Sequence, residues 1–493
     1  MEKIKEKAKS VFLDKKLYLF TIITFLFFGI YCLMQFAPDT YSVFTNSVKQ
    51  NTSHFLSCGR VVTALFFYMT MGVLKWSNTA IYMISYSIAI ICMIASLYLL
   101  YKLFKKDIKN ERICIISSIL LVINIFSIEL FVYIEKGIMM LSVLLCILAV
   151  IQIRNFFEGS KKAIIWATLL MLIANCCYQG TVGIFIAISL IYIIKYAKNI
   201  KEFVINNLIV AVTYGIPALI NFFMVRFLFT NSRVKGEIIL SESLEKLYQG
   251  TKNMILGTYD LFPKYLFAII LFILIVWIIY KIVRKSIATK TKILEILSIA
   301  YIVIGTIFAT VAPQILQDTG SIWFVARSSY PVAALLGILL AYAATKVETK
   351  KNAINIITIL SCLILVIQFI YFARFTIDNY IVNYEDRQNV EQIQKILYEY
   401  EQETGKQVTK IAFYEDEYPG YTYSHITAYG DMNLKAIYKN WSALRAINYY
   451  TNRNLEEVEK VEKIQNDFQK EEWSYFDKEQ LIIIDDTIHL CIY

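Results

Sequence analysis

The sequence lacks the short motifs that mark nucleotide-driven and zinc-dependent enzymes. It contains no phosphate-binding loop of the Walker type, no glycine-rich dinucleotide motif and no His-Glu-x-x-His pair. These absences argue against an ATP-driven machine and against a zinc protease. Histidine is also scarce, with only His54, His425 and His489 in 493 residues. Their spacing with Asp and Glu predicts no fixed metal site.

The nine cysteines form neither a metal-binding pattern nor a disulfide framework. Only Cys58 and Cys491 fall in segments expected to be aqueous. The others lie in apolar runs: Cys32, Cys92, Cys114, Cys146, Cys176, Cys177 and Cys362. The sequence also shows no cleavable signal peptide, because the first apolar run is long and has no small-residue cleavage site. We therefore interpret that run as a membrane anchor.

Apolar residues are abundant and arranged in long runs. The chain is 57% hydrophobic, and continuous runs of about 20 apolar residues, the length that an α-helix needs to cross a bilayer, recur along it. Continuous rather than alternating runs indicate helices and not a barrel. The net charge of +10 gathers in short basic loops between these runs. The sequence thus predicts an all-α polytopic membrane protein whose partner is the lipid bilayer and not nucleic acid.

The distribution of basic loops predicts the topology. The basic segment 1–16 should be cytoplasmic, and so should the basic loop 102–112. Both can be inside only if one of the apolar runs 59–76 and 79–101 does not cross, so we expect 59–76 to lie at the outer interface. About eleven membrane-spanning helices then remain: 17–36, 79–101, 113–133, 138–153, 163–178, 180–195, 204–229, 263–280, 293–311, 326–345 and 352–373.

Two domains follow from this pattern. Residues 1–375 form the predicted membrane domain, with residues 37–78 as its first outer loop. Residues 376–493 are charged and tyrosine-rich, and we expect them to form a small extracytoplasmic α/β domain. Its predicted elements are helices over 389–405 and 454–473, a strand over 408–415 and a hairpin over 480–493 that turns at Asp485–Asp486.

Polar residues suited to catalysis or ligand binding gather at the predicted outer ends of the spans. Asp39 and Tyr41 follow the first span in "APDTY", where the alternative is a solvated loop. Arg60 in "CGRVV" offers a guanidinium fork to a phosphate, and the alternative is a lipid headgroup anchor. Arg327 in "VARSSYP" stands beside hydroxyl groups and indicates an anion site rather than a snorkelling side chain.

Two further outer turns suggest contacts to a sugar. Glu135 and Lys136 could hold a sugar hydroxyl or an acceptor, or form a solvated hairpin. Glu129 lies deeper, so its burial requires a partner. Tyr178 and Gln179 in "NCCYQGTVGIF" suit stacking on a sugar and hydrogen bonding to it, and the alternative for them is an interfacial aromatic belt.

These pieces together resemble the GT-C class of integral-membrane glycosyltransferases. The sequence is most similar to the bacterial and phage glucosyltransferase II (Gtr) family, which decorates surface glycans. The matching segments are "APDTY", "GRVV", "YIEKG", "CYQGTVGIF" and "ARSSYP", and they cover residues 37–331. The hydrophobic architecture extends the similarity to about residue 375, whereas the C-terminal domain matches only in its position.

The resemblance implies an inverting transfer of a sugar, glucose by family default, from a polyprenyl phosphate to a cell-surface glycan at the outer face of the bacterial cytoplasmic membrane. Asp39 would be the catalytic base, and Arg327 with Arg60 would hold the donor phosphate. The sugar and acceptor would contact the remaining residues: Glu135, Lys136, Tyr178, Gln179 and Tyr41. Many relatives have two adjacent acids where this chain has Pro38 or Thr40 beside Asp39. A bound magnesium or manganese ion is therefore not assumed.

Other functional classes stay open at this point. A surface-polysaccharide polymerase or ligase would have a large outer loop between late spans, whereas the loop at 230–262 is modest. A lipid-linked sugar flippase would place charges near the bilayer midplane and would show an internal repeat. In this sequence the charges gather at one face, and we see no internal repeat. An inactive relative with a binding role is the third alternative.

Overall fold

The computed structural model describes most of the chain, in two compact units. The described residues are 14–229, 239–315, 319–346, 351–414, 432–438, 440–468 and 477–492. Most of the predicted basic N-terminal segment, the end of the predicted helix 454–473 and His425 lie outside them. The first unit comprises Met1–Cys32, Val48–Phe131 and Glu135–Phe372, and the second comprises Leu33–Ser47, Val132–Ile134 and Ala373–Tyr493.

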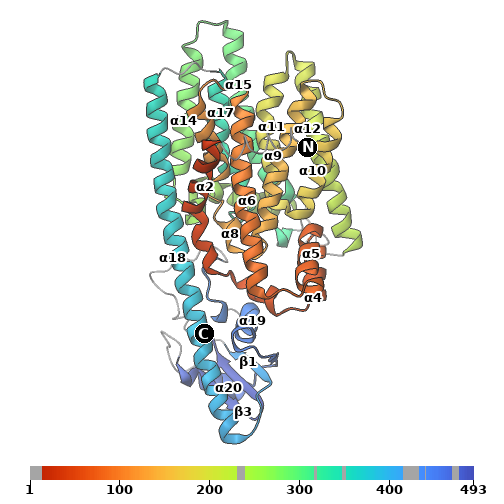
Figure 1. Ribbon diagram of the computed structural model, residues 1–493, viewed down its shortest axis with the longest axis vertical. Helices are drawn as coiled ribbons and strands as arrows, with labels where there is room; N and C mark the ends of the chain where they lie inside the picture. Colours follow the sequence, from red (N-terminus) through yellow and green to blue (C-terminus); the bar gives the residue numbers. More distant parts are fainter. Residues whose placement is uncertain are drawn as a thin grey trace. The chain divides into compact units, whose positions relative to one another are not determined.

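Long apolar helices dominate the first unit (Figure 1). Within the described residues, eight helices are long and apolar enough to cross a membrane, and the chain is thus a helical membrane protein. They are α2 with its 3-10 extension (Lys15–Leu33), α6 (Asn78–Lys105), α9 (Lys136–Phe157), η3 with α11 (Gln179–Tyr196), α12 with η4 (Ile200–Leu228), α14 (Leu266–Val283), α15 (Thr289–Ile315) and α18 (Lys351–Thr404).

Shorter helices account for the other apolar segments. The helices α10 (Ala163–Cys177) and α17 (Leu335–Lys346) occupy two predicted spans but have fewer residues than the eight long ones. The predicted interfacial segment is helical over Val61–Val73, as α5 (Val61–Phe67) followed by the π-helix η2 (Tyr68–Val73). Its position at an interface stays a prediction.

The predicted span 113–133 is wrong in its length. The helix α7 covers Glu111–Val122 only, and a separate single turn, α8, covers Glu129–Val132. Asn124 explains the break, because its side chain donates to the Leu121 carbonyl and accepts the Phe126 backbone N–H. Asparagine offers the backbone such local alternatives to helical hydrogen bonds. The helix therefore ends at Val122, and the chain turns before α8 begins at Glu129.

Close helix contacts hold the first unit together. Helix α9 packs against both α6 and α10, and α11 packs against α15. At the start of α9, a Cβ atom on Gly137 would lie 2.5 Å from the Ser85 carbonyl oxygen. The Gly137 N–H instead donates to the Ser85 hydroxyl at 3.0 Å. A small residue thus allows the backbones of α6 and α9 to touch, as is common between membrane helices.

A cluster of charged side chains, in which Arg154 and Asp107 are buried, joins three loops that we predict to be cytoplasmic. Arg154 near the end of α9 lies 3.0 Å from Asp107 and 2.9 Å from Glu158, and Lys195 also contacts Asp107. Asp107 lies in the predicted basic loop 102–112, Glu158 lies in the loop between the predicted spans 138–153 and 163–178, and Lys195 lies where the predicted span 180–195 ends. The structure therefore brings these loops to the same end of the first unit, at the C-terminal end of α9.

The second unit contains a four-stranded mixed sheet in the order β2-β1-β4-β3. The predicted strand is β1 (Lys410–Tyr414), and the predicted hairpin is confirmed as β3 (Leu481–Ile484) and β4 (Thr487–Cys491) around Asp485–Asp486. The predicted helix over 389–405 is the end of α18, which stops before Gly405. Bidentate contacts of 2.6 and 2.9 Å from Arg453 to Glu401 fix this end of the helix.

Two parts of the second unit differ from expectation. Within 454–468, the structure has the short strand β2 (Glu456–Glu457) and the helix α20 (Glu462–Phe468) in place of one long amphipathic helix. The strand forms because Glu456 and Glu457 pair in parallel with Lys410 and Ile411 of β1, a contact distant in sequence. The sequence analysis also missed α19 (Asn440–Thr451), which packs against α3 (Pro38–Thr45).

Candidate functional site

Three residues singled out in separate loops meet in the first unit. Arg60 directly precedes α5, Glu135 directly precedes α9, and Tyr178 directly follows α10. Arg60 Nη1 lies 3.3 Å from Glu135 Oε1, and the guanidinium carbon lies 4.7 Å from the centre of the buried Tyr178 ring. The guanidinium group is thus held by a carboxylate and by an aromatic face, both of which favour a positive charge.

The turn that carries Arg60 is fixed by two amide side chains. Gln179 donates through Nε2 to the Cys58 carbonyl at 3.0 Å and to Asn221 Oδ1 at 3.1 Å. Asn221 donates through Nδ2 to the Gly59 carbonyl at 2.7 Å. Gly59 has a φ of +71°, and a Cβ there would lie 2.6 Å from Val225 Cγ2. The backbone of this turn therefore requires glycine and has little freedom to move.

Sequence reasoning missed the contribution of Asn221. The residue lies in an apolar run that we treated only as a span, and in the structure it is buried near the end of α12. A signal was present, because polar side chains inside apolar helices usually have a specific partner. Gln179 was expected to contact a sugar, whereas the structure uses its amide to hold the turn before Arg60.

Arg327 forms a second ion pair, with Glu129. Its guanidinium Nη1 contacts Glu129 Oε1, and its backbone N–H donates to Glu129 Oε2. The Glu129 side chain is only 2% exposed, and that of Arg327 is 13% exposed. The expectation that a buried Glu129 needs a partner is confirmed, and the partner is the arginine that we had singled out as an anion ligand.

Tyr178 links the two ion pairs electrostatically. The charges of Arg60, Arg327, Glu129 and Glu135 all act on its side chain. The formal charges of these two cations and two carboxylates cancel. Among these four groups, a cation becomes available to an incoming anion only where a carboxylate releases its arginine.

Lys136 stands next to Glu135 but is fully buried. Its nitrogen lies 3.6 Å from the centre of the Tyr82 ring and 5.8 Å from that of Tyr31. Within the part of the chain that the structure describes, this nitrogen has no hydrogen-bond partner. Aromatic faces are the surroundings that support a buried cation in the absence of hydrogen bonds.

The cluster and the buried charges around Asp107 lie at opposite ends of the same helix. Lys136 begins α9, and Arg154 lies near its C-terminal end. At 1.5 Å per residue these positions are roughly 27 Å apart along the helix axis, which is close to the thickness of a bilayer core. The cluster therefore lies about one membrane thickness away from the loops predicted to be cytoplasmic.

Asp39 and Tyr41 belong to the second unit. Asp39 is exposed in the first turn of α3, where Pro38 occupies the first helical position. Tyr41 is buried, and its hydroxyl lies 2.9 Å from the hydroxyl of Tyr450. Its ring also packs against Phe36 and Tyr449. The carboxylate is thus accessible, whereas the hydroxyl predicted to contact a sugar is already hydrogen-bonded within its own unit.

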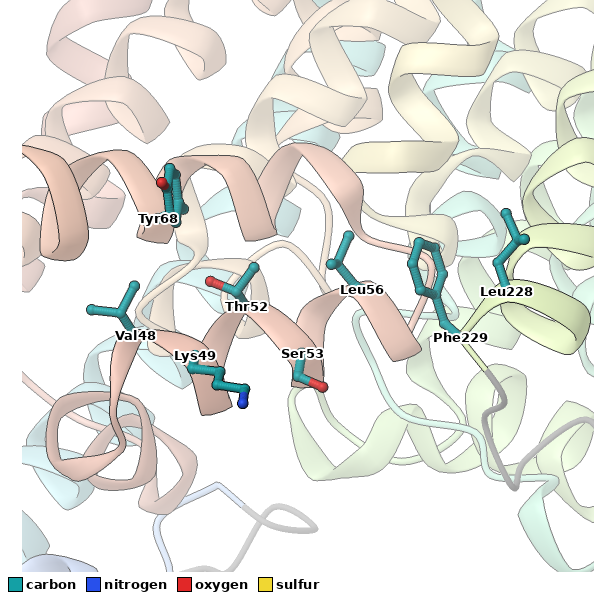
Figure 2. Close-up of a pocket in the computed structure, with 8 residues that line it drawn as sticks. All are labelled: Val48, Lys49, Thr52, Ser53, Leu56, Tyr68, Leu228 and Phe229. Carbon is teal, nitrogen blue, oxygen red and sulfur yellow. The ribbon is translucent and has the colours of Figure 1, made fainter.

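A surface hollow of about 620 Å³ lies beside the Arg60 turn. Figure 2 shows Thr52 and Leu56 pointing from α4 (Val48–Ser57) towards the helix that carries Tyr68, while Leu228 and Phe229 close one end. The complete lining is Val48, Lys49, Thr52, Ser53, Leu56, Tyr68, Leu228 and Phe229. An apolar wall with one cation and three hydroxyls suits an amphipathic molecule. None of the residues predicted for the site lines this hollow.

The described residues contain no group of three or more His, Cys, Asp or Glu side chains that could hold a metal ion. The carboxylates of the cluster are paired with arginines instead.

A helical membrane protein with ionised side chains gathered at the ends of apolar helices is the setting of a membrane enzyme or transporter. Residues 39–342 match the model of the family described as Glucosyl transferase GtrII, and the chain belongs to this family. No individual curated protein and no solved structure matches the chain. The matched range begins at Asp39 and contains every predicted site residue, whereas most of the second unit lies beyond it.

Proposed function

We propose that the protein transfers a sugar, glucose by family default, from a polyprenyl-phosphate donor to a cell-surface glycan. Family membership makes the chain a glucosyltransferase that acts on glycans. The observation that carries the donor assignment is the Arg60–Glu135 and Arg327–Glu129 cluster around Tyr178, at the ends of apolar helices. Arginine is the side chain best suited to a phosphate. A lipid phosphate would reach such a place from within the bilayer.

The reaction we propose inverts the anomeric carbon. The acceptor hydroxyl oxygen forms a bond to that carbon while the bond to the phosphate oxygen breaks, and the electron pair leaves with the lipid phosphate. Asp39 takes the hydroxyl proton as general base. Arg60 and Arg327 offset the charge of the departing phosphate. Glu135, backed by Lys136, orients the sugar together with Tyr178 and Gln179, and Tyr41 supports the Asp39 helix.

The proposed membrane arrangement follows the basic loops. It has about eleven crossings of the GT-C type, formed by the eight long helices with α7, α10 and the α16–α17 segment (Tyr330–Lys346). The segment Val61–Val73 lies at the outer interface. The N-terminus is cytoplasmic, residues 376–493 are extracytoplasmic, and the membrane is the bacterial cytoplasmic membrane. The distance of about one bilayer thickness between the cluster and the Asp107 loops supports an outer-face site.

The function is tested with purified protein in nanodiscs. The donor is undecaprenyl-phosphate-linked glucose, and the acceptor is a surface-glycan extract. We expect loss of the lipid-linked sugar that requires both protein and acceptor. Chain growth of the glycan by whole repeat units would instead indicate a polymerase or ligase. Movement of the intact donor between leaflets, without consumption, would indicate a flippase.

A further inference from the structure

The two arginines of the cluster are held in different ways. Glu129 contacts Arg327 at the guanidinium group and at the backbone N–H, and both side chains are largely buried. Arg60 has a single contact to Glu135, at the long distance of 3.3 Å. Its Nε is buried and has no hydrogen-bond partner within the described residues. Arg327 is therefore tied to its carboxylate at two points, the guanidinium group and the backbone N–H, whereas Arg60 is tied at one point by a longer contact.

Arg60 is nevertheless held in place. Its guanidinium group lies against the Tyr178 ring, and the preceding turn is fixed by Gln179 and Asn221. Its side chain is 18% exposed. A fixed, partly exposed guanidinium with one long carboxylate contact is prepared to exchange that carboxylate for another anion, and no backbone rearrangement is needed.

We propose that the Arg60–Glu135 pair is an exchangeable contact, in which a substrate phosphate replaces the Glu135 carboxylate on Arg60. Arg327 stays with Glu129 and acts on the site only through its position and charge. The inference rests on the proposed function, because it assigns the phosphate of that substrate to one arginine. It also gives Glu135 a second role, since a buried carboxylate released from Arg60 needs a new donor, and a sugar hydroxyl provides one.

Exchange has a consequence for selectivity. A lipid phosphate without a sugar would leave Glu135 unpaired, so its binding is opposed by the loss of the Arg60 contact. Neutralising Glu135 removes this opposition. Glu135→Gln should therefore bind a sugar-free lipid phosphate about tenfold more tightly, the size expected for a hydrogen bond to a charged group. Arg60→Gln should weaken the same binding by about tenfold or more.

The test uses the full chain in phosphatidylcholine nanodiscs with farnesyl phosphate as the probe. Binding is measured by isothermal titration for the wild type, Arg60→Gln, Glu135→Gln and Arg327→Gln, with a thermal melt of each. Arg112→Gln is the matched control, because Arg112 is exposed and contacts Asn355 away from the cluster. Competition by inorganic phosphate or by phosphatidic acid separates recognition of phosphate in general from recognition of the isoprenoid phosphate.

The expected pattern is weaker binding for Arg60→Gln, tighter binding for Glu135→Gln and an unchanged control. For Arg327→Gln we expect a lower melting temperature and a smaller loss of affinity than for Arg60→Gln. Wild-type affinity in Arg60→Gln, or weaker binding in Glu135→Gln, overturns the inference even if sugar transfer is found. The expected binding pattern without transfer from any donor would instead overturn the proposed function and leave the exchange intact.

Discussion

The side-chain nitrogen of Lys136 lies 3.6 Å from the centre of the Tyr82 ring, and both residues are completely buried. Tyr82 also donates its hydroxyl to the Tyr31 carbonyl at 2.8 Å. The ring and the hydroxyl therefore do different things, and they can be separated by mutation. We expect Tyr82→Leu to lower stability by about 2 kcal/mol more than Tyr82→Phe, because only the former removes the face beneath the nitrogen.

The measurement is thermal or denaturant unfolding of the purified protein, followed by tryptophan fluorescence. Lys136→Met in the Tyr82→Leu background should recover most of the difference, because the amine that needs the ring is then gone. Equal losses in Tyr82→Leu and Tyr82→Phe would contradict a stabilising contact between the nitrogen and the ring.

The Arg327–Glu129 pair should behave as a buried ion pair. Glu129→Ala leaves an uncompensated guanidinium among apolar helices, and we expect it to cost about 3–5 kcal/mol of unfolding free energy. Replacing both residues, as Glu129→Leu with Arg327→Met, should cost less than Glu129→Ala alone, since no buried charge remains. Unfolding midpoints of the single and double variants decide the matter. A double variant that is less stable than Glu129→Ala would show that the ion pair stabilises the protein by more than the mutual neutralisation of its two charges.

Gly59 should tolerate no side chain. It has a φ of +71°, and a Cβ would lie 2.6 Å from Val225 Cγ2 and 2.7 Å from Asn221 Oδ1. Gly405 is a matched control, because its φ is +66° and a Cβ there would meet nothing within 4 Å. Gly405→Ala should cost about 1 kcal/mol for the left-handed backbone alone. Gly59→Ala should cost clearly more in an unfolding measurement, and it should also reduce sugar transfer because Arg60 follows directly. Equal costs at both positions would show that the contacts around Gly59 adjust freely.

Much of the membrane part could be predicted from composition alone. The runs of apolar residues predict the positions of the long helices. In lipid, a continuous apolar run can satisfy its backbone hydrogen bonds only as a helix. The end of α7 could not be found in this way, because Asn124 breaks the helix through its own hydrogen bonds to Leu121 and Phe126. Apolar content cannot report such a local competition.

The residues of the site were predicted better than their pairing. Arg60, Glu135 and Tyr178 stood out as polar groups at the ends of apolar runs, but nothing in their spacing indicates that they touch. Asn221 was overlooked because one amide scarcely changes the hydrophobicity of a span. The pairing of β2 with β1 was also missed, since Glu456 and Glu457 lack strand propensity and become a strand through a distant partner.

The second unit should lose stability in mild acid because of His489. Burial lowers the pKa of this imidazole below its ordinary value of 6.5. The Tyr414 hydroxyl accepts the Val461 N–H at 3.0 Å and lies 2.8 Å from His489 Nδ1, so its own proton is available to a neutral imidazole. The unfolded chain binds the proton more readily. Stability is therefore complete above pH 6.5 and falls as the pH drops from there towards the folded pKa.

Hydrogen exchange of the β1 and β4 amides in the full chain, corrected for the intrinsic effect of pH, measures this change. We expect protection to fall between pH 7.5 and pH 5.5 in the wild type. In His489→Gln the loss of protection due to this imidazole should be absent, because glutamine can accept the Tyr414 hydroxyl but does not titrate. Burial raises the pKa of Asp386 in the same unit to about 7, and this group titrates in both proteins, so the difference between the two profiles isolates His489. Parallel profiles for the two proteins would assign the acid sensitivity to another group.

Asp39 should be required for chemistry and not for folding. Its side chain is exposed in the first turn of α3, where the loss of one negative charge costs at most about 1 kcal/mol. Asp39→Asn should therefore keep the wild-type melting temperature and donor affinity while it lowers transfer by at least about a hundredfold, the usual range for a lost general base. Asp485→Asn is the matched control, since Asp485 is an exposed aspartate with a positive φ that asparagine accepts.

The decisive comparison is single-turnover transfer by the two variants at saturating donor. A slow Asp39→Asn enzyme whose rate no longer rises with pH, beside a fully active Asp485→Asn enzyme, is the behaviour of a missing base. A fully active Asp39→Asn enzyme would remove Asp39 from the mechanism. Glu135 would then be the next carboxylate to test, because the exchange on Arg60 frees it while the substrate is bound.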